Sequence, residues 1–444
     1  MSDLFSLLSV GSNAMAAQNT GISIATNNVA NANTEGYSRQ RLGDVSSGQP
    51  VRLQDNLLSG QIQTAAGSLA MSQAFAEALS ALEGGVAGGG ATIDEQIGNL
   101  FAKVGQASAA PTDSASRDAV VAAARALVGG IQRRASEVAE ARKAADTRIR
   151  DNATQATALA KQLAAANTAV AKSGDPAALD QRDKIAKHLG ELVGGKARID
   201  HDGQMRFVLD GGAVLVDGTH PATLAATTDP ATGVARVEVV NGAARRDVTA
   251  AIGGGKIGAD LKFRDQNVAQ AATQLDQVAF DVTTSLNAVH TANAGLDGVS
   301  GRPMFTPQTQ VAGAAASIAV DPALAADSKL LALAAPGTGA GNNAGALALF
   351  SVATQKVASG GTSTLGDAAL DVVSNVAVAS SNAKGDVTRD NLVSDNLAGL
   401  RDSLSGVDTQ EELTNLARFE HASTAMAKFV STIDGMLGSL IDNL

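Results

Sequence analysis

Apolar residues recur at helical spacing at both ends of this chain. Near the start, Leu4, Leu8, Met15, Ile22, Ala25 and Val29 fall on one stripe of a helix. Near the end, steps of three, four or seven residues connect Leu416, Phe419, Met426, Val430, Ile433, Leu437, Leu440 and Leu444. The simplest way to bury each stripe is against the other. The pattern therefore predicts paired terminal helices at residues 1–36 and 408–444.

The first helix carries almost no charge. From Met1 to Thr34 the only charged side chain is Asp3, and Ser, Thr, Asn and Gln fill the remaining surface. A solvated helix usually carries many charges on its outer face. A neutral polar face favours a helix that is covered by protein on several sides.

Helical periodicity also dominates the middle of the chain. The longest run joins Val120, Leu127, Ile131, Val138, Ala145, Ile149, Ala156, Leu159, Leu163 and Val170, and this spacing predicts a long helix of coiled-coil type. Asp113 or Ser114 is its expected N-cap, and Gly174 to Pro176 ends it. Further helices are expected over 61–82, before a flexible Gly-rich connection at 84–90, and over 260–292, 344–357 and 364–404.

Residues 196–250 have a different pattern. Apolar and polar residues alternate in KARID, QMRFVL, AVLV and VARVEVV, and Asp-Gly, Gly-Gly and Asn-Gly turns separate these segments. This predicts a small inserted antiparallel β domain at 196–255. The expected fold is therefore mainly α and elongated, with a helical middle domain at 37–195 and 256–407.

Charge and composition exclude several classes of protein. The 34 basic residues are outnumbered by 44 acidic ones, so the net charge of −10 argues against nucleic-acid binding. The chain has no cysteine and therefore no disulfide or thiol nucleophile. No apolar run is long enough to span a bilayer, so we expect no membrane insertion. The start lacks a basic segment before its apolar run, so we expect no cleaved signal peptide.

The sequence offers little catalytic chemistry. Five histidines are scattered without a pair at metal-binding spacing. The stretch from Gly253 to Ile257 lacks the hydroxyl residue of a phosphate-binding loop. The stretch from Asp200 to Gly203 lacks the distal glutamate of a calcium loop, and it is read as a hairpin turn. We therefore expect no catalytic, metal or cofactor site and no enzyme activity.

Residues 27–41 read NNVANANTEGYSRQR. This stretch resembles the N-terminal motif of the flagellar axial protein family, which comprises rod, hook and hook-associated subunits. The motif residues here are Asn27, Asn28, Asn31, Gly36 and Tyr37. Segments at 178–193, 254–266, 341–349 and 405–437 resemble the hook-associated branch of that family. Within the motif, we expect Thr34 to Gly36 to end the first helix and Gly36 to adopt a left-handed conformation.

The resemblance implies a structural subunit of the bacterial flagellum at the junction between hook and filament, needed for filament assembly. It implies self-association in a ring through the two terminal stripes. It also implies contacts with the hook protein and hook-associated protein 3, and an export chaperone on the C-terminal helix. The location is the extracellular flagellum, reached by type III export.

Two alternatives stay open. One is another axial subunit, such as the hook protein or hook-associated protein 3. The other is a wall hydrolase that travels with the flagellum. The chain also departs from the family pattern, because only the small β unit is available as an outer domain and His421 stands near a position where relatives often have tyrosine.

Overall fold

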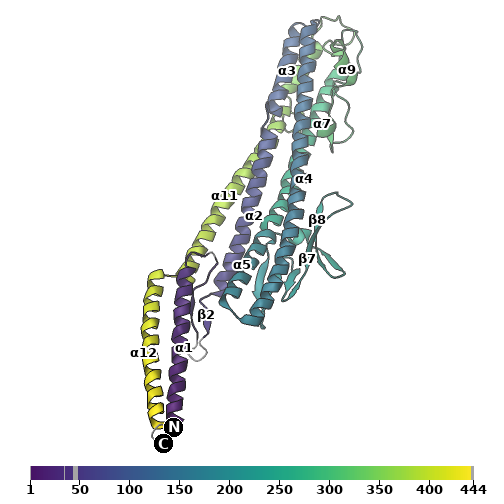
Figure 1. Cartoon of the computed structure of the whole chain (residues 1–444). Coiled ribbons are helices and arrows are strands. Elements are labelled where there is room, and N and C mark those ends of the chain that lie inside the picture. Colours follow the sequence, from purple (N-terminus) through teal and green to yellow (C-terminus); the bar gives the residue numbers. More distant parts are fainter. Residues whose placement is uncertain (1, 35, 44–48, 442–444) are drawn as a thin grey trace. The chain divides into compact units, whose positions relative to one another are not determined.

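The computed structural model describes residues 2–34, 36–43 and 49–441, and its fold is mainly helical, as the periodicity predicts. Two compact units divide the chain. The first unit comprises Met1–Met71, Arg150–Gly258 and Thr388–Leu444, and the second comprises Ser72–Ile149 and Ala259–Val387. Figure 1 shows the elements of each unit along the chain. The division into terminal, middle and inserted β domains remains a prediction.

The α-helices have the following bounds. They are α1 (Ser2–Ala30), α2 (Asn56–Ala87), α3 (Ile93–Ala109), α4 (Ser114–Ser173), α5 (Pro176–Val193), α6 (Gly255–Lys262), α7 (Ala269–Ala292), α8 (Ala314–Ser317), α9 (Pro322–Ala326), α10 (Ala344–Ser351), α11 (Leu365–Ser405) and α12 (Thr409–Ile441). A π-helical turn, Phe263–Val268, connects α6 to α7. Helices α2, α4 and α11 each contribute residues to both units.

The strands lie in the first unit and form small antiparallel sheets. Strands β1 (Gln40–Leu42) and β2 (Pro50–Arg52) form a hairpin. A four-stranded sheet has the order β3-β4-β5-β6, and a three-stranded sheet has the order β7-β8-β9. Their bounds are β3 (Lys196–Ile199), β4 (Met205–Val208), β5 (Val214–Asp217), β6 (His220–Pro221), β7 (Thr223–Thr228), β8 (Ala235–Asn241) and β9 (Ala244–Asp247). The prediction of antiparallel strands between 196 and 250 is confirmed, but the sequence missed the β1–β2 hairpin.

Helix α4 follows the apolar periodicity closely. Eight of the ten predicted stripe residues are buried, from Val120 through Leu163, while Leu159 and Val170 are half-buried. Asp113 caps the start of the helix by accepting a hydrogen bond from the Ser116 amide at 2.8 Å. A cap and a stripe of this kind depend on residues a few positions apart, and for this reason the sequence predicts them well.

Helix α2 is longer than predicted at both ends. It begins at Asn56 and continues through Gly84 and Gly85 to Ala87, so the interpretation of this part of the Gly-rich stretch as a flexible connection is wrong. Buried Leu79, Leu82 and Val86 hold this end of the helix in the core of the second unit. Tertiary burial therefore outweighs the low helix propensity of glycine here. Only five residues separate the end of α2 from the start of α3, a helix that the sequence analysis did not identify.

Glycines allow two loops of the first unit to touch. Gly194 ends α5, and Gly255 begins α6, both with positive φ. A Cβ atom at Gly255 would lie 2.6 Å from the backbone of Leu192, and one at Gly194 would lie 2.8 Å from Gly254. These contacts explain Gly254 and Gly255 as sites of close backbone packing.

Buried polar side chains organise the loops of the second unit. The Arg117 guanidinium is fully buried and donates hydrogen bonds to the carbonyls of Pro111 at 2.6 Å and Leu331 at 2.7 Å. His290 lies 2.7 Å from the Arg302 carbonyl through Nδ1 and accepts a hydrogen bond from the Ala332 amide at Nε2. These contacts require a neutral imidazole, and burial lowers the pKa of His290. His290 is therefore a structural residue.

Candidate assembly interface

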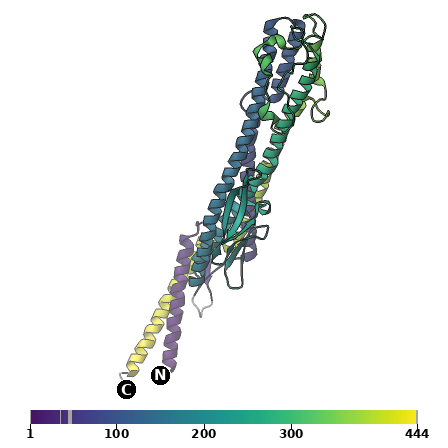
Figure 2. The ribbon, with the colours of Figure 1, turned by 90° about the vertical axis from the view of Figure 1, so that its right-hand side faces the viewer.

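The terminal helices α1 and α12 lie side by side and run antiparallel (Figures 1 and 2). The pairing can be followed along their length. Gly11 lies beside Phe429, Asn19 accepts a hydrogen bond from Ser423 at 3.0 Å, and Gly21 lies beside Phe419. The prediction that the two ends of the chain pair with each other is confirmed.

Small residues on α1 allow the two helices to approach closely. A Cβ atom at Gly21 would lie 2.8 Å from the ring of Phe419, and one at Gly11 would lie 3.0 Å from Phe429 and Val430. Real Cβ atoms do not approach other heavy atoms this closely without displacing them. The two glycines therefore provide the space into which the aromatic rings of α12 pack.

The buried face of α1 differs from the predicted stripe. Ala17, Ile24, Ala25 and Asn28 are buried, together with both glycines of the contact. The predicted residues Leu4, Leu8, Met15, Ile22 and Val29 are half-buried along one flank of that face. Ala25, which belongs to the predicted stripe, is buried. Gly11, Gly21 and Asn28 follow heptad spacing with it, but a search for large apolar residues passes over them.

On α12 the predicted stripe lies close to α1 over most of its length. Ile433 and Leu437 are buried, and Leu416, Phe419, Met426 and Val430 are half-buried. Leu440 is 42% exposed, so much of its side chain faces solvent. Leu444 lies outside the described residues. The assignment of both stripes to contacts between subunits remains a prediction.

A second set of apolar side chains on these helices is exposed to solvent. It consists of Phe5, Leu7 and Val10 on α1 and Leu413, Met436 and Leu440 on α12. Two paired helices can bury only the faces that they turn toward each other. The remaining apolar surface is of the kind that marks contacts with other proteins.

Asn28 is the centre of a buried polar cluster where α1 ends. Its Oδ1 accepts hydrogen bonds from the Tyr37 hydroxyl at 2.8 Å and from the Gln40 amide at 2.9 Å. Its Nδ2 donates to the Gln40 carbonyl at 2.9 Å and to Glu412 Oε2 at 3.0 Å. The fully buried amide therefore joins α1, the following loop and α12. We call Asn28, Tyr37, Arg39, Gln40 and Glu412 the junction cluster.

Charged residues complete the junction cluster. Arg39 donates from Nε to Glu412 Oε1 at 2.7 Å and from Nη2 to Glu411 Oε1 at 2.6 Å. Arg401, near the end of α11, donates to the Tyr37 carbonyl at 2.8 Å. Hydrogen bonding to Glu411 is the main cause that raises the pKa of Arg39. The cluster therefore links the ends of α1 and α11 to the first turn of α12.

The surroundings of Tyr37 raise the pKa of its hydroxyl group. Partial burial, together with the negative charges of Asp180 and Glu412, raises its pKa to about 12. Asp180 and Asp183 both receive hydrogen bonds from Arg52 of β2, at 2.7 and 2.9 Å. These two carboxylates therefore anchor the β1–β2 hairpin to α5.

The other motif residues shape the turn after α1. The helix ends at Ala30, four residues before the predicted end at Thr34. Asn31 makes this earlier end by donating from Nδ2 to the Asn27 carbonyl at 2.9 Å and accepting from the Thr34 hydroxyl at 3.2 Å. Gly36 has φ +85°, which confirms the predicted left-handed conformation. Asn27 itself is exposed.

The described residues contain no group of three or more His, Asp or Glu side chains placed to hold a metal ion. Over the same part of the chain, no helix is both long enough and apolar enough to cross a membrane.

Two family models match the chain. The model of the flagellar hook-associated protein FlgK helical domain matches residues 79–305, just over half of the chain. The model of the flagella basal body rod protein matches residues 8–37, which include most of α1 and end at Tyr37. The second match covers residues 27–37 of the motif described above, which include its five named residues.

Curated relatives agree with these matches. Flagellar hook-associated protein 1 of Salmonella typhimurium is 22% identical over 327 residues, which cover 68% of this chain and 59% of that protein. The Bacillus subtilis protein of the same name is 24% identical over 505 residues, which cover 100% of this chain and 99% of that protein. The chain thus spans about three fifths of the length of its Salmonella relative.

A solved structure has a similar fold. The hook junction protein FlgK from Burkholderia pseudomallei superimposes with a TM-score of 0.70 at 16% sequence identity. The match covers 78% of this chain and 100% of that structure. At this identity, the likeness concerns the fold.

Proposed function

Because the chain belongs to the family of the flagellar hook-associated protein FlgK, we propose that it is a structural subunit of the bacterial flagellum. It forms the junction between hook and filament and is needed for filament assembly. This family consists of structural flagellar proteins and is not an enzyme family. The proposed location is the extracellular flagellum, reached by type III export without a cleaved signal peptide.

The exposed apolar surface of the α1–α12 pair carries this proposal. Helix α1 has no charged side chain between Leu4 and Ala30, so covering it by other subunits would bury no ion. Phe5 and Val10 on α1 and Met436 on α12 stay exposed when the two helices pair. Packing of the terminal pairs of several subunits against one another would bury this surface and form a ring.

The same surface supports the choice of partners. The subunits of the ring contact one another through the two terminal stripes, and the ring lies between the hook protein and hook-associated protein 3. Before export, a chaperone covers the C-terminal helix, whose exposed apolar residues would otherwise be a liability for aggregation. The junction cluster then sets the direction in which the terminal pair leaves the rest of the first unit.

Deletion of the gene tests the proposal. We expect cells with hooks but without filaments, and monomeric flagellin in the medium. A strain that still builds normal filaments would overturn the proposed function. If the deletion also removes the hooks, the alternative of another axial subunit such as the hook protein is favoured. An assay of wall degradation by the purified chain, which we expect to be negative, tests the alternative of a wall hydrolase.

A further inference from the structure

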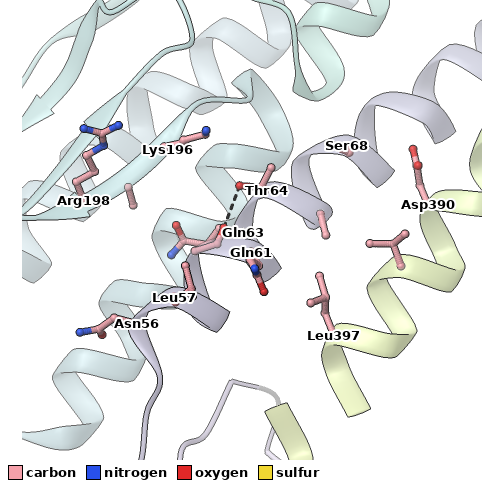
Figure 3. Close-up of a pocket in the computed structure, with 14 residues that line it drawn as sticks. Asn56, Leu57, Gln61, Gln63, Thr64, Ser68, Lys196, Arg198, Asp390 and Leu397 are labelled. Atoms are coloured by element: carbon pink, nitrogen blue, oxygen red, sulfur yellow. Dashed lines mark hydrogen bonds between the residues drawn. The ribbon is translucent and has the colours of Figure 1, made fainter. Parts of the chain in front are cut away.

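A groove of about 650 Å³ lies in the first unit between α2, β3 and α11. Figure 3 shows its walls, with Leu57 on α2, Lys196 and Arg198 on β3, and Leu397 on α11. Val393 completes the apolar part of the α11 wall. Leu57 is 73% exposed and Val393 is 45% exposed, so large apolar side chains face solvent here.

The apolar side chains on α11 form a regular stripe. Val393, Leu397, Leu400 and Leu404 are separated by four, three and four residues, which is the spacing of a seam between two helices. Leu400 and Leu404 are exposed. The stripe therefore has the pattern of a helix face that packs against another helix, although within this chain it remains largely uncovered.

The groove also carries positive charge. Lys196 and Arg198 on its wall have no ion-pair partner among the described residues. Asp390, on the opposite wall, pairs with Arg389 at 3.2 Å. The chain as a whole has a net charge of −10. Apolar walls with unpaired cations select a surface that is apolar and acidic, and another copy of this acidic chain has that character.

Two smaller hollows lie along α11 between the groove and the junction cluster. A second hollow, of about 270 Å³, shares Gln63 with the groove and continues along α11 to Ser38 and Arg401. A third hollow includes Tyr37 and Arg401 and reaches Val407, just before α12. The hollows therefore follow one face of α11 from β3 to the point where the terminal helices begin.

We propose that this groove is a contact site for a helix of a second copy of the chain. The inference rests on the proposed function and adds a specific surface to it. Val393, Leu397 and Leu400 would be covered by apolar side chains of the second copy, and Lys196 and Arg198 would face its carboxylates. Such a contact joins two different surfaces, and head-to-tail contacts of this kind form a ring when the rotation between successive copies closes on itself.

Crosslinking in assembled flagella tests this contact. A photoreactive benzophenone residue is placed at position 393 or, as the matched control, at position 392. Leu392 is exposed on the same turn of α11, but it does not line the groove. We expect an adduct of two copies from position 393 and none from position 392. An adduct of position 393 with a different protein, or no adduct there, would overturn the proposal.

Substitutions provide a second readout. Val393→Asp and the double change Lys196→Glu with Arg198→Glu should reduce incorporation into flagella at least tenfold, while Leu392→Asp should have little effect. Circular dichroism of each purified monomer checks that it folds. If deletion of the gene abolishes filaments but Val393→Asp assembles normally, the groove proposal fails and the proposed function stands. If deletion leaves filaments intact, the proposed function fails.

Discussion

The Tyr37 hydroxyl donates a hydrogen bond to Oδ1 of Asn28 at 2.8 Å. Tyr37 is the only tyrosine in the chain, and there is no tryptophan. The same Asn28 amide binds Glu412 of α12. The absorbance of one phenol therefore reports whether α1, the loop after it and α12 are together.

Titration of Tyr37 provides the first prediction. In the folded chain its pKa should be about 12, because burial and the charges of Asp180 and Glu412 disfavour the phenolate. Glu412→Gln removes one of these charges and should lower the pKa toward the ordinary value of 10.0. Tyrosinate absorbance as a function of pH measures both values. A pKa near 10 in the unmodified chain would show that the junction cluster is not formed.

Asn28→Ala should loosen the start of α12. The substitution leaves the Gln40 backbone groups and the Tyr37 hydroxyl without their partner, at a cost of about 2 to 3 kcal/mol. Hydrogen exchange of the amides in the first turns of α12 should become faster. Asn27→Ala is the matched control, because Asn27 is exposed. Equal exchange rates in the two variants would argue against a role for Asn28 in holding α12.

Leu437 and Leu440 should respond differently to substitution by aspartate. Leu437 is buried beside α1, so Leu437→Asp should already separate the helices in the monomer and lower its helix content. Leu440 is exposed, so Leu440→Asp should leave the monomer intact but prevent its incorporation into flagella. Circular dichroism and microscopy measure the two effects. Normal incorporation of Leu440→Asp would remove Leu440 from the assembly interface.

Gly21→Val should separate α1 from α12 near Phe419. The new side chain would begin 2.8 Å from the aromatic ring, and overpacking of this kind typically costs about 1 to 3 kcal/mol. Adding Phe419→Ala should recover part of the loss, because it makes room for the valine. Thermal unfolding, followed by helix content, measures the effect. If the stability lost by the double variant equalled the sum of the losses of Gly21→Val and Phe419→Ala, the two side chains would not be in contact.

Asp260 should make the second unit more stable at mildly acidic pH. Burial raises the pKa of Asp260 to about 6, against the opposing effect of Arg148, while Glu77 raises it and Arg264 lowers it. An acid whose pKa is higher in the folded state loses a destabilising charge as pH falls. Its contribution to the free energy of unfolding should therefore increase by about 2 to 3 kcal/mol between pH 7 and pH 4.

The variant Asp260→Asn isolates this contribution. Denaturant unfolding of the variant should lack the part of the pH dependence between about 4 and 6 that the unmodified chain shows. His290 acts in the opposite direction, because its lowered pKa favours the folded state above pH 6.5. The quantity to measure is therefore the free energy of unfolding of the unmodified chain minus that of Asp260→Asn at each pH. Subtracting the two curves removes the contribution of His290. If this difference in the free energy of unfolding stayed the same between pH 4 and pH 6, the raised pKa of Asp260 would be contradicted.

Local patterns account for much of the fold. The spacing of apolar residues predicted α4 and its buried stripe, and Asp113 was one of the two expected caps of that helix, because a cap acts within three residues. The β1–β2 hairpin was missed because its strands have only three residues each, too few for alternation to be recognised. The length of α2 was underestimated because the helix continues past Gly84 and Gly85 despite their low helix propensity. Burial of the apolar side chains at this end of the helix stabilises it.

The sequence by itself determined that both ends are amphipathic helices, that α1 carries almost no charge, and that the motif at 27–41 closes α1 with a turn. Only the tertiary structure decided which face of α1 is buried, since Gly21 matters through Phe419 of α12. It also decided the role of Tyr37 and Asn28, because Asn28 meets Glu412 across 384 positions of the chain. Periodicity and caps act between near neighbours in the chain, whereas a buried amide takes its partners from whatever the fold brings beside it.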